Sequence, residues 1–158
     1  MVDTYERESR RVSRRVLRGF SPERFVALRK SKMSTSDLAR LSRVTASTLY
    51  AWQKGTFTPQ VDKLAAVMKV LATPIEQVVL IPRDQRFPGD WRVLSGLTQP
   101  VLASSAGIAT SKLQRIESGE SQPTTEQVNV LSSLLGATAE EYRAAWLRAR
   151  DRPPGTPV

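Results

Sequence analysis

Hydrophobic residues in this chain fall at the spacing of amphipathic helices. Leu49 with Trp52, and Leu113 with Ile116, lie three residues apart, which places each pair on one buried side of a helix. Strand signals are absent. Residues that cap helices or suit a first helical turn stand at Ser21-Pro22, Ser34, Thr45, Thr73-Pro74, Thr98, Thr124 and Thr138. The pattern predicts an all-α chain of short helices.

The sequence repeats itself after 64 residues. Leu38-Ala39, Ser47, Leu49, Gly55, Pro59 and Leu71 return as Leu102-Ala103, Ser111, Leu113, Gly119, Pro123 and Leu135. Solenoid units usually span about 20–50 residues, so a repeat of this length favours a small domain present twice. We therefore expect two tandem domains of five short helices each.

Helix-breaking residues divide the chain into five parts. Pro82, Pro88 and Gly89 interrupt the middle, and Pro153-Pro154-Gly155 with Pro157 follow the last helix. The expected organisation is a basic N-terminal helix or arm (1–20), a first domain (21–80), a linker (81–89), a second domain (90–150) and a disordered tail (151–158). Nine linker residues reach at most about 30 Å.

The N-terminal segment has two interpretations. Val12, Val16 and Phe20 lie opposite its arginines on a helical wheel, so the helix could simply pack on the body of the protein. Alternatively, it lies along nucleic-acid phosphates or enters a groove. The arginines concerned are Arg10, Arg11, Arg14, Arg15 and Arg18.

Composition argues against several classes of function. The 158 residues include no cysteine and no histidine, which removes disulfides, the usual zinc sites and the commonest general base. We expect no enzyme activity, no metal and no cofactor. The chain has no long apolar run and no signal-peptide pattern at its start, so we expect a cytoplasmic protein without membrane contact.

Charge points to a polyanionic partner. The net charge is +9, and residues 1–80 hold 15 Lys or Arg against 7 Asp or Glu, whereas residues 81–158 hold 9 against 8. Such a basic, lopsided balance favours nucleic acid as the partner and a nucleoid-associated location.

One stretch of each copy has the pattern of a helix-turn-helix. It runs from 34 to 55 in the first copy and from 98 to 119 in the second, and it contains a capped helix with Leu-Ala inside, a break, and a second short helix followed by glycine. Val44 and Ile108 follow the break and are expected to fill the angle between the helices. The outward residues are short or polar.

This pattern resembles the helix-turn-helix domains of the lambda Cro and C1 repressor (XRE) family, over residues 22–80 and 86–147. The resemblance implies that the second helix of each motif enters the major groove of double-stranded DNA, where arginine suits guanine. The residues placed to read bases are Ala46, Ser47, Thr48, Tyr50, Ala51, Thr110, Ser111, Lys112 and Arg115. Those placed toward phosphates or the groove are Ser34, Thr35, Arg43, Lys54, Thr98 and Gln99, together with the N-terminal arginines.

The family often pairs an arginine in the opening helix with a glutamate closing the recognition helix. The second copy has Arg92 and Glu117, whereas the positions 64 residues earlier hold Leu28 and Gln53. Losing both partners is far less costly than stranding one buried charge. We therefore interpret the first copy as a degenerate but folded domain that has lost this ion pair.

Two divisions of labour remain open. Either the arm and first copy supply affinity while the second copy supplies specificity, which we favour, or the second copy binds a protein, as in an antitoxin or adaptor that would use Trp146, Leu147 and the tail. The resulting hypothesis is a repressor of phage or mobile-element type that occludes polymerase as a monomer on an asymmetric site. The alternatives are a homodimer on a palindrome and a non-specific nucleoid protein.

Overall fold

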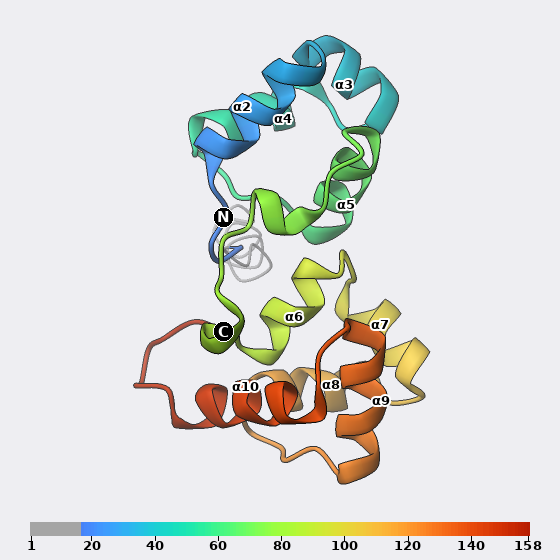
Figure 1. Cartoon of the computed structure of the whole chain (residues 1–158), viewed down its shortest axis with the longest axis vertical. Helices are drawn as coiled ribbons and strands as arrows, with labels where there is room; N and C mark the ends of the chain where they lie inside the picture. The colour runs from blue at the N-terminus through green and yellow to red at the C-terminus, as the bar shows by residue number, and fades with distance from the viewer. Residues whose placement is uncertain (1–16) are drawn as a thin grey trace, which may run out of the picture.

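The computed structural model describes residues 17–158, and all regular elements in that range are helices (Figure 1). The first domain holds four α-helices and a 3₁₀ turn, and the second holds five α-helices, with another 3₁₀ turn between them. In chain order they are α2 (Pro22–Lys32), α3 (Thr35–Ser42), α4 (Ala46–Lys54), α5 (Val61–Val70), η1 (Ile75–Gln77), η2 (Arg83–Gln85), α6 (Pro88–Leu94), α7 (Gln99–Ala106), α8 (Thr110–Glu117), α9 (Thr125–Leu135) and α10 (Ala139–Asp151).

Local capping explains where most of these helices begin. The hydroxyls of Ser34, Thr45 and Thr98 each accept a hydrogen bond from the backbone N–H three residues later. Thr124 and Thr138 form full capping boxes. Sequence signals therefore predicted these helix starts correctly, because a cap depends on residues within one turn.

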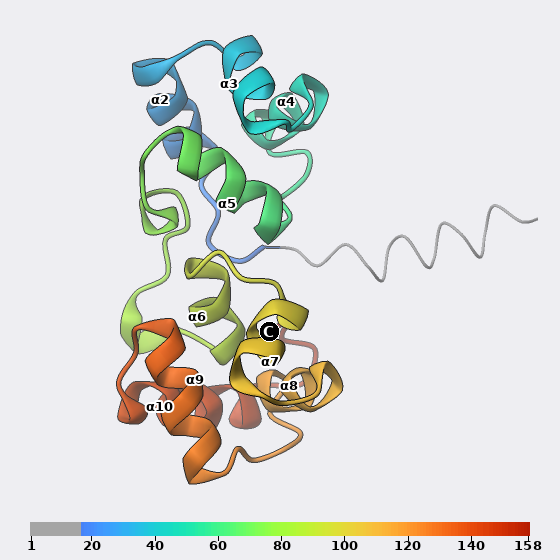
Figure 2. The ribbon, with the colours of Figure 1, turned by 90° about the vertical axis from the view of Figure 1, so that its right-hand side faces the viewer.

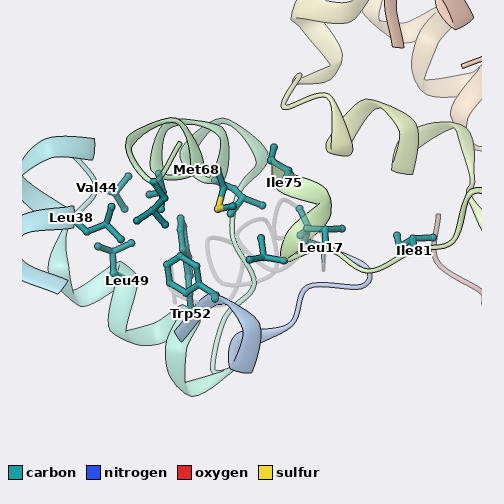
Figure 3. Packing of buried hydrophobic residues seen from close by; sticks show 14 residues of the cluster. Leu17, Leu38, Val44, Leu49, Trp52, Met68, Ile75 and Ile81 are labelled. Atoms are coloured by element: carbon teal, nitrogen blue, oxygen red, sulfur yellow. The ribbon is translucent and has the colours of Figure 1, made fainter. Parts of the chain in front are cut away.

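Each domain has its own hydrophobic core. The first core is built around Phe25, Leu38, Leu49, Trp52 and Leu64, and Figure 3 shows Ile81 at the edge of this cluster that lies toward the second domain. The second core gathers around Trp91, Leu102, Leu113, Leu131 and Tyr142. Two separate cores confirm that the repeat corresponds to two folded units.

The segment before the first domain joins that domain's core. Residues 1–16 of the expected N-terminal helix lie outside the described residues, and residues 17–20 are a turn followed by an isolated antiparallel bridge between Phe20 and Val79. Leu17 is buried in the first core. The helix does not continue through Gly19, whose φ of +75° suits a turn and whose surroundings leave no room for a Cβ.

Two other elements differ from the expectation. Thr73-Pro74 precedes a single 3₁₀ turn rather than a full helix, and Val78 and Val79 then bury their side chains beside the Phe20 bridge. Helix α6 begins at Pro88, inside the expected linker, because proline fits the first turn of a helix as well as a loop.

The last residues make contacts with the second domain. The Arg152 guanidinium donates to the carbonyls of Ser118 and Ala149, and its Nε donates to the carbonyl of Thr156. No helix among residues 17–158 is both long enough and apolar enough to cross a bilayer.

Candidate nucleic-acid interface

Helices α4 and α8 occupy the same place in their respective domains. Each follows a tight turn and packs on its own core through two residues, Leu49 and Trp52 in α4 and Leu113 and Ile116 in α8, all at most 2% exposed. Val44 is buried at the first turn, and Ile108 packs on the second core. The opposite side of each helix is therefore presented to solvent.

The first turn of the motif is closed by a residue in the left-handed conformation. In the first domain this is Arg43, with φ of 60°, and in the second it is Gly107, with φ of 70°. The Arg43 side chain is exposed, next to the N-terminus of α4. A basic side chain thus stands where the matching position of the second domain has none.

The exposed surface of α4 is uncharged until its last residue. Ser47 and Tyr50 are exposed, and Lys54 is exposed at the helix end. Ala46, Thr48 and Ala51 are half-buried, and the Thr48 hydroxyl accepts a hydrogen bond from that of Thr45.

The exposed surface of α8 has more hydrogen-bonding capacity. Thr110, Ser111 and Arg115 are exposed, and the Arg115 guanidinium has no hydrogen bond or ion pair with any residue from 17 to 158. Lys112 differs, because its Nζ donates to the Ser121 hydroxyl at 2.6 Å and its side chain lies along the protein. Arg115 is consequently the described cation on this helix that is free to meet a ligand.

The start of α8 also lacks a cap. Ala109 occupies the N-cap position and offers no side-chain hydrogen bond within the described structure, whereas Thr45 caps α4. The sequence predicted this difference. The backbone N–H groups in the first turn of α8 are therefore less satisfied than those of α4.

Below these helices, a hydrogen-bond network links the opening helix, the start of the motif and the end of the recognition helix. In the second domain, Arg92 Nε lies 2.8 Å and Nη2 3.1 Å from the two carboxylate oxygens of Glu117. Gln99 Nε2 donates to the same carboxylate at 2.9 Å, and Arg92 Nη1 donates to the Leu97 carbonyl. Arg92 and Glu117 are both more than nine-tenths buried.

The first domain keeps this network, contrary to our expectation that both partners had been lost. Arg29 Nε donates to Gln53 Oε1 at 3.2 Å, and Arg29 Nη1 donates to the Met33 carbonyl. Gln53 Nε2 in turn donates to the Thr35 hydroxyl at 3.3 Å. The position 64 residues before Arg92 is Leu28, so the arginine stands one position later than the repeat implied.

Helix length explains this shift. Helix α2 continues to Lys32, whereas α6 ends at Leu94 and is followed by a turn at Gly96, so the chain between the arginine and the next helix differs by one residue. The pair in the first domain is Arg–Gln rather than Arg–Glu. Its guanidinium is half-buried and has no carboxylate partner among residues 17–158.

The residues expected near phosphates are not equally accessible. Ser34, Arg43 and Lys54 are exposed, whereas Thr35 is buried and Thr98 and Gln99 are half-buried. Gln99 already donates to Glu117. Arg18 has a different partner, since it donates to the Asp90 carboxylate, and Arg10, Arg11, Arg14 and Arg15 lie outside the described residues.

Trp146 does not offer the docking surface considered for a protein-binding function. Its side chain is 6% exposed, and its Nε1 donates to the Ser121 carbonyl at 3.1 Å. Leu147, by contrast, is 43% exposed.

The two motifs face the same way. Figure 2 shows α3 with α4 and α7 with α8 on one side of the molecule, while α2, α9 and α10 lie toward the other side. In Figure 1 both α4 and α8 lie behind the other helices of their domains, in agreement with that view.

Comparison with protein families matches both halves of the chain. A family described as a Cro/C1-type HTH DNA-binding domain matches residues 26–82, and a family described as a helix-turn-helix domain matches residues 89–146. No curated protein and no solved structure gives a significant match.

Proposed function

Because the chain carries two helix-turn-helix domains in tandem, the first of the Cro/C1 type, and so belongs among the DNA-binding regulators, we propose that it reads one asymmetric DNA site with both recognition helices. In this proposal α4 and α8 enter the major groove of one duplex, and a single chain suffices. Occupying the site represses transcription by excluding polymerase.

The observation that supports this proposal best is the placement of α4 and α8 on one side of the molecule (Figure 2). Two recognition helices on one side can meet one duplex, whereas helices on opposite sides could not. Their exposed residues differ, with Ser47 and Tyr50 on α4 facing the same task as Ser111 and Arg115 on α8. Two different reading surfaces call for two different half-sites.

Charge supports a division of labour between the domains. Positive charge is concentrated in residues 1–80, and the exposed Arg43 and Lys54 flank α4. These residues supply affinity for phosphates, which fixes position without reading sequence. Arg115 on α8 supplies specificity, because its free guanidinium suits the O6 and N7 atoms of guanine.

Selection of bound sequences from a random DNA pool tests this proposal. The wild-type chain should select one long site without two-fold symmetry. Arg115→Ala should relax one half of it and weaken binding by about 1–3 kcal/mol, and Tyr50→Ala should relax the other half. Arg143→Ala is the matched control, because Arg143 is an exposed arginine on α10, away from the proposed interface.

Other outcomes lead elsewhere. A palindromic site would indicate a dimer that uses one type of recognition helix. A short motif that is indifferent to Arg115→Ala would show that the second domain does not read DNA.

A further inference from the structure

Helix α6 joins the two domains through apolar contacts. It is the first helix of the second domain, yet Val93 and Leu94 near its end pack against the core of the first domain. Just beyond it, a Cβ added to Gly96 would lie 3.1 Å from the Cβ of Ala65 on α5 and 3.4 Å from Cδ1 of Ile75. The two domains therefore touch at atomic contact distance.

An ion pair adds a second link. Arg18, on the segment that enters the first domain, donates to the carboxylate of Asp90 on α6, and its guanidinium lies 4.3 Å from the centre of the Phe87 ring. Asp90 is only 6% exposed, and the same carboxylate accepts the Phe87 backbone N–H at 2.8 Å. A buried carboxylate without a cationic partner would be strongly unfavourable, so this contact resists separation of the domains.

The linker itself is held against the second domain. Arg83 on η2 makes two 2.8 Å hydrogen bonds to the Glu141 carboxylate on α10. The carbonyl of Arg86 accepts from Arg148 Nε at 2.9 Å, while Arg86 Nε donates to the carbonyl of Ile81, whose side chain belongs to the first core. A linker attached at both ends is not a flexible tether.

We infer that the docked interface of α6 with α5, secured by the Arg18–Asp90 pair, sets the spacing at which the protein accepts two half-sites. Successive major grooves recur about every 10–10.5 base pairs, so one inserted pair moves and rotates one half-site relative to the other by about 34°. Two rigidly joined helices cannot follow that movement, whereas two tethered domains can. This inference rests on the proposed reading of one site by both helices, and it makes Arg18 a positioning residue.

Two variants separate the domains without altering either recognition helix. Ala65→Arg places a long side chain against Gly96, and Arg18→Ala removes the ion pair. Ala66→Arg is the matched control, since it makes the same substitution one residue along α5, on a side chain that does not face Gly96. A measurement without DNA comes first. Backbone ¹⁵N relaxation should show both domains of the wild type and of Ala66→Arg tumbling as one body, and those of Ala65→Arg tumbling faster and independently.

The DNA experiment uses the selected site with zero to five base pairs inserted between its halves. Fluorescence anisotropy should show that wild type and Ala66→Arg lose affinity at least about tenfold with one or two inserted pairs. Ala65→Arg and Arg18→Ala should show a much flatter dependence on insertion. If Arg18→Ala instead weakens binding equally at every spacing, Arg18 contacts phosphate and its positioning function is wrong.

Failure of this inference can be told from failure of the proposed function. A wild-type protein that binds a two-part site but tolerates every insertion overturns the inference and leaves the two-helix reading intact. Selection of no two-part site at all overturns both.

Discussion

At the scale of single residues, one substitution distinguishes the networks beneath the two recognition helices. Glu117 gives the buried Arg92 a carboxylate, whereas Gln53 gives Arg29 a neutral amide oxygen. The difference is tolerated because Arg29 is half-buried and keeps contact with solvent, while Arg92 is not. The need for a counter-charge thus follows burial rather than position in the repeat.

Exchanging the two acceptors should have unequal effects. Glu117→Gln leaves the Arg92 charge buried without a carboxylate and should lower the free energy of unfolding by about 3 kcal/mol. Gln53→Glu creates a half-exposed ion pair with Arg29 and should raise it by at most about 1 kcal/mol. Urea unfolding of both variants measures these changes. Equal and opposite effects would contradict the assignment, because they would mean that burial does not matter.

At the scale of elements, α10 determines what the end of α8 can contain. A Cβ at Gly119 would lie 2.7 Å from the backbone N and Cα of Arg150, and the φ of Gly119 is +81°. The corresponding Gly55 has a similar φ of +73°, but the nearest atom to its added Cβ is Pro22 Cγ at 3.6 Å. The same glycine of the repeat is therefore required for conformation in one domain, and for both conformation and close packing in the other.

A pair of alanine substitutions should separate these two requirements. Gly107→Ala meets no described atom within 4 Å, so it should cost only the left-handed strain of about 1–2 kcal/mol. Gly119→Ala carries the same strain and also displaces α10, so it should cost clearly more. Thermal unfolding compares them. Similar melting temperatures for the two variants would show that α10 moves aside freely.

Capping provides a second test at this scale. Ala109→Thr should raise the free energy of unfolding by about 1 kcal/mol, because a hydroxyl would then satisfy a free N–H of α8. Thr45→Ala should lower it by a similar amount in the first domain. Circular dichroism during urea unfolding measures both. No change on adding the threonine would mean that water already serves the α8 terminus equally well.

At the scale of the whole molecule, exposed and buried ion pairs brace the linker and the domain interface. The hydrogen bonds from Arg83 lower the pKa of Glu141 to about 2, and the Thr138 backbone N–H contributes to the shift. Burial raises the pKa of Asp90, which the Phe87 N–H and Arg18 partly oppose. The Arg83–Glu141 brace therefore depends on an ionised carboxylate at an exposed site.

This brace should weaken in acid. The folded pKa of Glu141 lies below its ordinary value of 4.5, so the stabilising contribution is complete above that pH and is lost as the pH falls toward 2. Glu141→Gln preserves a capping oxygen but removes the charge. Its free energy of unfolding should be lower than that of wild type at pH 7, and the difference should shrink between about pH 5 and 2. A difference that does not change with pH would rule out the charge as the cause.

The sequence by itself determined the helical class, the tandem repeat, the caps and the buried sides of α4 and α8. Each depends on residues within a few positions of one another, as Thr45 with Thr48 or Leu49 with Trp52 do, so periodicity and capping chemistry are sufficient.

Only the tertiary structure decided which groups meet across longer distances. Arg18 contacts Asp90 across 72 residues and Arg83 contacts Glu141 across 58, and nothing in the local pattern selects these partners. Arg29 was missed because the repeat was read at a constant offset, although the arginine beside Leu28 was visible. Its true partner depends on how far α2 extends before the chain turns, which packing determines. The docking of the two domains follows from the same cause, because contacts between separate cores are chosen by shape and charge in three dimensions.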